Sequence, residues 1–192
     1  MKLLLISDLH GNFPALAAVA AAERGVDRVV CLGDLVNYGP HPAACVDWAR
    51  ANVPEDWIVQ GNHDRALGCG EDPRCSAAYR ELAAAMQRYT ETRLDEGRKR
   101  YLAGLPRRRP APARRASSSA TSPDASLRIG GAAVALCHAV PSDPLYGYLP
   151  PDSDPLLWEA ECAAAGAPDF LFIGHTHLQF ARKAGRTTVV NP

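Results

Sequence analysis

The sequence has no excess charge of either sign and no long apolar run. It contains 21 Lys and Arg against 21 Asp and Glu, so its formal net charge is zero. A neutral chain has no global field that would attract nucleic acid or an anionic membrane. No apolar run reaches the roughly 18 residues that are needed to span a bilayer. These absences argue against a membrane-spanning protein and against a general nucleic-acid-binding protein.

A secretory leader is not indicated either. Lys2 and the apolar residues after it are too few for a signal peptide, and Asp8 follows with no small-residue cleavage site. Four of the six cysteines lie in apolar strand-like or Ala-rich helical runs: Cys31, Cys45, Cys137 and Cys162. Small buried thiols are typical of a reducing compartment, so the sequence predicts a cytoplasmic protein. Cys69 and Cys75 flank a short loop and could pair or bind a metal, but two free thiols are the favoured interpretation.

The length and composition suit one domain. The chain has 192 residues, of which 47% are apolar and 22% charged, so we expect a single domain over 1–192 with a sizeable core. The periodicity predicts the following strands: 2–7, 28–32, 57–60, 127–129, 133–137, 169–173, 179–182 and 186–190. It predicts helices over 13–23, 42–51, 76–104 (in two pieces, broken near Thr92) and 154–165. This strand–helix–strand rhythm implies right-handed crossovers and a largely parallel α/β sheet.

Residues 106–126 break this pattern. The segment has no apolar periodicity and contains several prolines, a run of serines and five arginines at 107, 108, 109, 114 and 115. We expect a flexible low-complexity insertion. The arginines could bind a phosphate-rich partner such as nucleic acid, but a solvated loop is the favoured interpretation.

Five of the six histidines lie in short motifs with Asp, Asn and Gly. The motifs are Asp8-Leu9-His10, Gly33-Asp34, Gly61-Asn62-His63-Asp64, Cys137-His138 and Gly174-His175-Thr176-His177. In shuffled chains of this composition, Gly-Asn-His-Asp alone would occur about once in a thousand, so scattered surface or core histidines explain the set poorly. Imidazole and carboxylate are the usual ligands of first-row divalent metals, and two ions sharing a bridge are a standard device for displacement at phosphorus.

Each motif begins where a predicted strand ends. In open α/β sheets, ligands bind beyond the carboxyl ends of the strands. We therefore expect Asp8 with His10, Asp34, and Asn62 with His63 to meet at one edge.

The order of these motifs resembles that of the calcineurin-like metallophosphoesterases, and the small prokaryotic phosphodiesterase branch is the most similar. The segments Gly33–Pro40 and Pro144–Tyr148 also resemble that branch. The resemblance runs over residues 3–192. It implies a four-layer α/β/β/α sandwich with two mixed β-sheets and a dinuclear metal site at the strand ends.

The resemblance also implies a role for each site residue. Seven residues are expected to be metal ligands: Asp8, His10 and His177 for one ion, Asn62, His138 and His175 for the other, and Asp34 as the bridge. His63 is expected to face the scissile phosphate without binding metal, and Asp64 to hold its ring. Two positions depart from the family. Ala139 stands where a glycine is usual, and the chain ends at Pro192 where related sequences continue, so we expect a C-terminal end truncated relative to the family.

These residues predict a metal-dependent phosphoesterase that hydrolyses phosphodiesters, with monoesters as further substrates, by attack of a metal-bridging hydroxide. His63, as imidazolium, would stabilise phosphoryl charge or protonate the leaving group. Mixed nitrogen and oxygen ligands favour Mn²⁺, our first expectation, or Fe, Co²⁺, Ni²⁺ or Zn²⁺. Tyr38, Tyr146 and Tyr148 lie beside the motifs. They could stack on a base or aryl group or serve only to pack their loops.

Several alternatives stay open. A protein phosphatase or a dinucleoside polyphosphate hydrolase commonly carries more arginines around the phosphate, and here the only clustered arginines lie in 106–126. A non-catalytic scaffold of the same fold is disfavoured because His63 and all seven candidate ligands are present. The expected partner is a small-molecule phosphoester, and a homo-oligomer is among the options for assembly.

Overall fold

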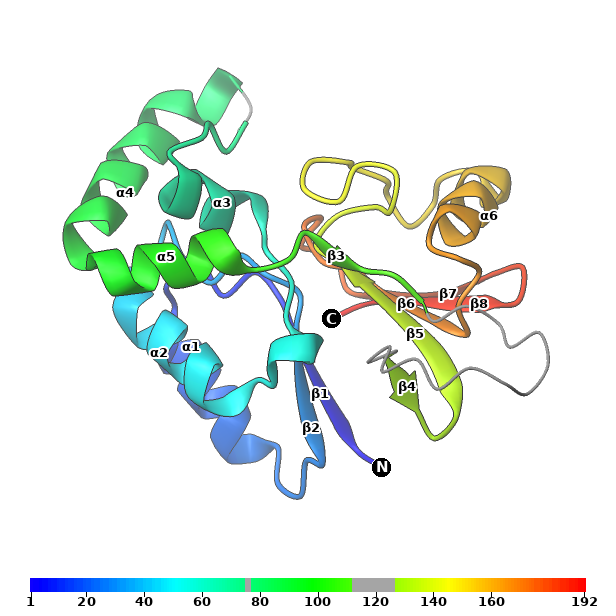
Figure 1. Cartoon of the computed structure of the whole chain (residues 1–192). Helices are drawn as coiled ribbons and strands as arrows, with labels where there is room; N and C mark the ends of the chain where they lie inside the picture. Colours follow the sequence, from blue (N-terminus) through cyan, green and yellow to red (C-terminus); the bar gives the residue numbers. More distant parts are fainter. Residues whose placement is uncertain (75–76, 112–126) are drawn as a thin grey trace.

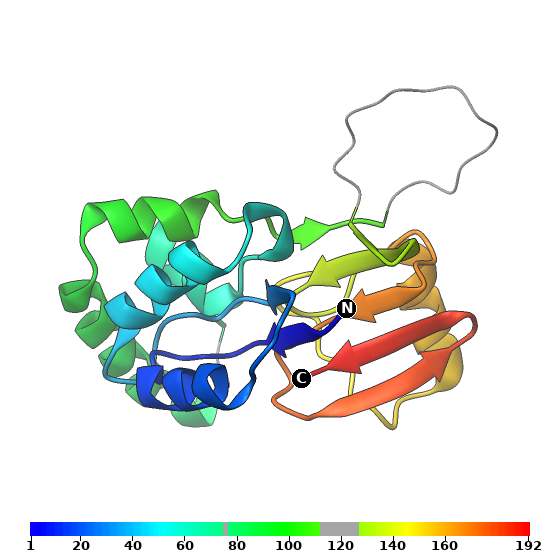
Figure 2. The ribbon, with the colours of Figure 1, turned by 90° about the horizontal axis from the view of Figure 1, so that it is seen from below.

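Two β-sheets lie between two layers of helices in the computed structural model, which describes residues 1–74, 77–111 and 127–192 (Figures 1 and 2). The predicted four-layer α/β/β/α arrangement is confirmed. One helical layer covers the small first sheet, and a single helix covers the outer face of the larger second sheet. None of the helices in the described ranges combines the length and the apolar composition that a bilayer crossing needs.

The first sheet is a parallel pair with its crossover helix. Its elements, with the helix that follows, are β1 (Leu3–Ile6), α1 (Phe13–Ala22), β2 (Arg28–Cys31) and α2 (Pro42–Asn52). The side chain of Asn12 accepts a hydrogen bond from Ala15 N at 3.2 Å and caps α1, as the sequence predicts. Strands β1 and β2 pair in register from Leu3 with Arg28 to Ile6 with Cys31.

The third predicted strand, 57–60, is not a regular strand. Glu55–Trp57 form a 3₁₀ turn (η1), and Ile58 makes only one isolated parallel bridge, to Cys31. The next amide that could continue the pairing, that of Gln60, donates to the carbonyl of Pro106 at 2.8 Å. The segment therefore follows β2 for one residue and then turns toward the chain that enters the second sheet.

The helical segments after α2 extend the layer that α1 and α2 form beside the first sheet (Figure 1). They are α3 (Asn62–Cys69), η2 (Ala77–Tyr79), α4 (Arg80–Arg93) and α5 (Glu96–Gly104). The predicted break near Thr92 is confirmed, because α4 ends at Arg93 and the Asp95 side chain caps α5 by accepting from Arg98 N at 2.8 Å. Helix α3 was not predicted, and it begins inside the Gly-Asn-His-Asp motif.

The second sheet is mixed. Its strands and the helix on its outer face are β3 (Arg108–Arg109), β4 (Arg128–Ile129), β5 (Ala132–Cys137), β6 (Phe170–Phe172), β7 (Phe180–Ala184), β8 (Thr187–Asn191) and α6 (Pro155–Ala164). The strand order is β3-β5-β6-β8-β7, and β5, β6 and β8 are parallel. The predicted hairpin before His138 and the last two strands are confirmed.

Two residues near the start of the predicted insertion form a β-strand. Arg108 and Arg109 form β3, which pairs antiparallel with Cys137 and Leu136 of β5. The rest of that prediction concerns residues 112–126, which lie outside the described residues. The prediction that Cys69 and Cys75 are two free thiols also lies outside the described residues, because Cys75 is not described.

Alternate side chains of β5 pack against the two layers on either side of the second sheet. Val134 and Leu136 join the core cluster that contains Val30 of β2, whereas Ala135 and Cys137 join the cluster around Trp158 of α6. Successive strand residues face opposite sides of a sheet, so β5 packs on the first sheet with one face and on α6 with the other. The predicted burial of Cys31, Cys45, Cys137 and Cys162 is confirmed.

Candidate active site

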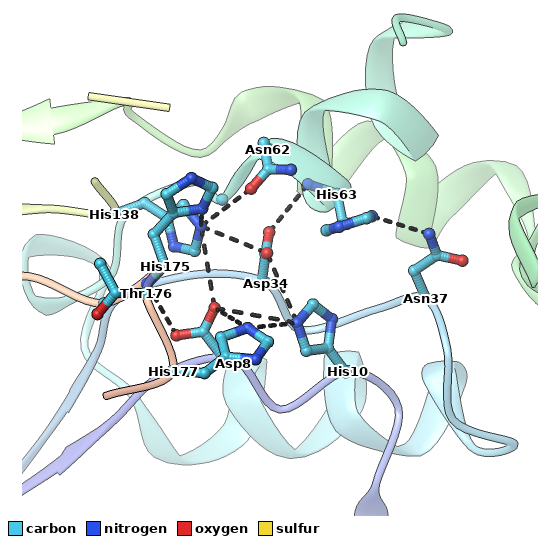
Figure 3. A network of polar contacts seen from close by, with 12 residues as sticks. Asp8, His10, Asp34, Asn37, Asn62, His63, His138, His175, Thr176 and His177 are labelled. Atoms are coloured by element: carbon cyan, nitrogen blue, oxygen red, sulfur yellow. Dashed lines mark hydrogen bonds and ion pairs between the residues drawn. The ribbon is translucent and has the colours of Figure 1, made fainter. Parts of the chain in front are cut away.

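The histidine motifs converge at one end of the two sheets (Figure 3). Asp8 and His10 follow β1, Asp34 follows β2, and Asn62 and His63 open α3. The second sheet contributes three more residues: His138 directly after β5, and His175 and His177 after β6. The structure thus brings all seven predicted ligands and His63 to one edge.

The backbone is strained where these side chains leave the sheets. Five of the candidate ligands have a positive φ: Asp8 (54°), His10 (44°), Asp34 (54°), His175 (67°) and His177 (56°). Such a conformation costs a non-glycine residue about 1–3 kcal/mol and persists only where the surroundings impose it. Here the amides of Asp8 and His10 donate to the carbonyls of Gly33 and Asp34, at 3.0 and 2.9 Å. The ends of β1 and β2 are therefore locked together in the conformation that aims their side chains.

One donor cluster lies around Asp8. Its ligand atoms, from Asp8, His10 and His177, all lie within 4.8 Å of one another. Nε2 of His177 is 3.2 Å from Oδ1 of Asp8 and 3.2 Å from Nε2 of His10. Oδ1 of Asp8 is buried, and its polar neighbours are imidazole nitrogens, with His177 Nε2 the nearest. A buried carboxylate oxygen that faces imidazole nitrogens fits a cation at their common centre.

A second donor cluster lies around His138. Its Nε2 is 3.3 Å from Oδ2 of Asp34, 3.0 Å from Oδ1 of Asn62 and 3.2 Å from Nδ1 of His175. Oδ2 of Asp34 also lies 3.8 Å from Nε2 of His10. Asp34 therefore stands between the two clusters, as the predicted bridge would.

Two of the rings are oriented by backbone carbonyls. Nδ1 of His138 lies 2.8 Å from the carbonyl oxygen of Leu32, and Nδ1 of His10 lies 3.2 Å from that of Val36. Each Nδ1–H donates to a carbonyl, so Nε2 of the neutral ring has its lone pair toward the cluster. This arrangement is typical of histidines that bind metal.

The predicted contact between Asp64 and the His63 ring is wrong. The carboxylate of Asp64 accepts hydrogen bonds from the backbone amides of Asp34 and Leu35, both at 2.8 Å, and of Gly61 at 3.0 Å. Asp64 therefore holds the loop that carries Asp34 and caps the start of α3.

The partner of His63 is Asn37, which the sequence analysis did not single out. The amide nitrogen of Asn37 lies 2.8 Å from Nδ1 of His63 and donates to it, which leaves the ring proton on Nε2. Asn37 is fully buried, and its φ is 76°. The signal was available in the sequence, because Asn37 lies within the family-like segment Gly33–Pro40.

Burial and neighbouring charges shift the pKa values of the site. Burial lowers the pKa of His63 to about 4, so its ring is neutral at pH 7 and not the expected imidazolium. For His138, burial alone would lower the pKa, but the charge of Asp34 raises it to about 10. Asp34 shows the reciprocal effect: burial opposes its charge, but His138 and His63 lower its pKa overall. The site thus favours a positive charge beside Asp34.

The departure at Ala139 has no structural cost. Its backbone is not among the described positions with positive φ, and its amide donates to Pro144 O at 2.9 Å. A glycine is therefore not required at this position.

Comparison with known proteins identifies the family. Residues 1–192 match the family model of the calcineurin-like phosphoesterase superfamily domain. An uncharacterized protein of Methanocaldococcus jannaschii is 29% identical over 180 residues, which are 92% of this chain and 62% of that protein. Phosphodiesterase YfcE of Escherichia coli is 42% identical over 57 residues, which are 29% of this chain and 31% of that enzyme. The chain therefore spans less than two thirds of the length of these relatives.

A solved structure shows the same fold. The crystal structure of a metallophosphoesterase from Sphaerobacter thermophilus superposes with a TM-score of 0.70 at 26% sequence identity, covering 100% of this chain and 76% of that one.

Proposed function

Because the chain belongs to the calcineurin-like phosphoesterase superfamily, we propose that it is a metal-dependent phosphodiesterase acting on small phosphoesters. The observation that carries the proposal is the convergence of carboxylate and imidazole groups around the buried Oδ1 of Asp8. Similarity to the Escherichia coli phosphodiesterase YfcE supports diesters as the substrate class.

We assign the metal ligands as follows: Asp8, His10 and His177 to one ion, Asn62, His138 and His175 to the other, and Asp34 to both. When bound, two divalent ions, Mn²⁺ being our choice, would supply Lewis acidity to the phosphoryl group and activate water at neutral pH. The mixture of imidazole, carboxylate and amide donors suits Mn²⁺, Fe, Co²⁺, Ni²⁺ or Zn²⁺.

His63 is proposed to serve the substrate. A His63 nitrogen also lies within 4.8 Å of a His10 nitrogen and an Asp34 oxygen, so a role as a third ligand is the competing assignment. However, Asn37 occupies Nδ1 and leaves the proton on Nε2. An Nε2–H group at this place can donate a hydrogen bond to a phosphoryl oxygen and so stabilise the charge that develops there.

The test is a phosphoester panel assayed with each candidate metal. Bis-p-nitrophenyl phosphate, p-nitrophenyl phosphate, a phosphopeptide and a diadenosine polyphosphate would be compared with wild-type protein and with Asp34→Asn. We expect the diester to be hydrolysed fastest, and Asp34→Asn to lose more than about 100-fold in rate together with bound metal. Preference for the phosphopeptide or the polyphosphate would favour the corresponding alternative. Metal binding without hydrolysis of any ester would favour a scaffold.

A further inference from the structure

The three tyrosines beside the motifs have different surroundings. Tyr146 is used for packing: its hydroxyl donates to Asp72 O at 3.4 Å, and the guanidinium of Arg74 lies 4.2 Å from its ring centroid. Tyr38 and Tyr148 instead border the donor clusters and stay 39% and 58% exposed. Of the three tyrosines, these two are the more exposed and lie beside the proposed ligands.

The two exposed rings lie at different histidines. The Tyr38 ring centroid is 4.9 Å from those of both His10 and His63. The Tyr148 ring is 6.1 Å from that of His175. His10 belongs to the Asp8 cluster and His175 to the His138 cluster. The tyrosines therefore flank the two proposed metal positions.

The backbone under Tyr148 is fixed although its ring is exposed. A Cβ on the preceding Gly147 would lie 2.3 Å from Cγ2 of Val140, so the turn is tightly packed. Ser142 anchors the same loop to α6, through its amide at 2.9 Å and its hydroxyl at 2.6 Å from the carboxylate of Glu161. A ring on a fixed backbone loses less entropy on binding than a ring on a mobile loop.

Tyr38 is held in a comparable way. Its φ is 61°, which is a genuine outlier for a bulky residue. The next residue, Gly39, donates to His10 O at 2.7 Å and has no room for a Cβ, which would lie 2.3 Å from that same oxygen. Strain of this kind clusters at ligand sites.

We propose that Tyr38 and Tyr148 form a two-sided aromatic subsite for a phosphodiester, in which Tyr148 stacks on a planar aromatic group of the ester arm that extends past His175. The proposal rests on the proposed function and narrows the substrate to diesters with an aryl or nucleobase arm. Stacking is tolerant of the identity of the ring because every base presents a π face. A monoester has no second arm and gains nothing from Tyr148.

The test keeps the leaving group constant and changes the other arm. Methyl p-nitrophenyl phosphate, bis-p-nitrophenyl phosphate and thymidine 5′-p-nitrophenyl phosphate all release p-nitrophenolate, so differences in rate report the retained arm. The variants are Tyr148→Leu, Tyr148→Phe, which keeps the ring, and Tyr79→Leu as a control. Tyr79 is 64% exposed in η2.

We expect Tyr148→Leu to lower kcat/KM about 5- to 50-fold for the two aromatic arms, mainly through KM, and to leave the methyl ester unchanged. Tyr148→Phe and Tyr79→Leu should behave as wild type, with unchanged Tm.

A loss of kcat/KM for the p-nitrophenyl arm alone would identify an aryl subsite. A loss for both aromatic arms would identify a subsite that also takes nucleobases. Equal effects on methyl and aromatic arms, or none, would overturn the subsite while the phosphodiesterase stands. A wild-type protein that hydrolyses none of the three esters would overturn both.

Discussion

In three of the site histidines, the two ring nitrogens have different neighbours. In His10 and His138, Nδ1 is bound to a backbone carbonyl and Nε2 faces the donor clusters. In His63, Nδ1 is bound to the amide of Asn37, and the proton therefore sits on Nε2. Under the proposed assignment, the same ring would be an acceptor for metal in two places and a donor to substrate in the third.

This difference predicts that His63→Ala keeps both ions and loses turnover by about 10²–10⁴-fold. Because the neutral ring donates a hydrogen bond and not a proton, the loss should be similar for p-nitrophenolate and for a poor leaving group. A smaller loss for p-nitrophenolate would instead indicate a protonated ring that acts as a general acid. Asn37→Ala should show a milder loss with the same metal content, because the ring loses its orientation only. Metal analysis beside kinetics on matched esters checks this. Loss of an ion in His63→Ala would make His63 a ligand.

We expect Asp64 to affect metal binding indirectly, because it holds the loop that carries Asp34. Its carboxylate accepts three backbone amides and is fully buried. Asp64→Asn replaces one acceptor oxygen by a donor, so at least one buried amide loses its partner, at a cost of about 1–3 kcal/mol. We expect a lower Tm and weaker metal binding, whereas Asp56→Asn, at an exposed carboxylate, should change neither. An unchanged Tm with a selective loss of turnover would restore the predicted role beside His63.

At the scale of elements, the site depends on how closely strand ends approach. Gly174, after β6, packs on the end of β1: a Cβ there would lie 1.9 Å from Oγ of Ser7 and 2.8 Å from Oδ2 of Asp8. The amide of His175 donates to that same Oδ2 at 3.0 Å. The two sheets therefore touch at a position where only glycine fits.

Gly174→Ala should consequently weaken metal binding at least about 10-fold and lower Tm, because Ser7 and Asp8 must move away. Gly104→Ala is the matched control, since a Cβ there meets nothing within 4 Å. Isothermal titration with Mn²⁺ and thermal unfolding of both variants would decide. Metal affinity equal to wild type in Gly174→Ala would mean that the contact between the sheets does not shape the site.

Elements with a local signal could be predicted from the sequence, and elements that depend on distant partners could not. Apolar periodicity and the Asn12 cap were sufficient for α1, and the family order of motifs was sufficient to place the donors together. Strand β3 exists only because β5 accepts it as a partner, and that partner lies far along the chain. The Asp64 error has a different cause. Asp64 follows His63 on a helix, and adjacent helical residues do not face each other.

At the scale of the whole molecule, the site joins the two layers of sheet. Asp8, His10, Asp34 and Asn62 come from the first layer, and His138, His175 and His177 come from the second. A metal shared by both sets binds the folded arrangement and not the unfolded chain. Metal binding should therefore stabilise the whole fold, by about 2.7 kcal/mol at a free metal concentration 100 times Kd.

Metal affinity should depend on pH, because His138 must lose a proton before it can bind metal. The charge of Asp34 raises the pKa of His138 to about 10, so the metal-free protein holds a proton there at pH 7. A metal that takes Nε2 must displace this proton, because only the neutral ring is a ligand. Metal affinity should therefore rise with pH up to about 10 and fall as the pH is lowered, by about tenfold per unit for each proton released.

Isothermal titration with metal at pH 7, in buffers of different ionisation enthalpy, measures directly how many protons are released. We expect at least one to be released. Affinity that is independent of pH, with no buffer dependence of the heat, would mean that His138 is not a ligand.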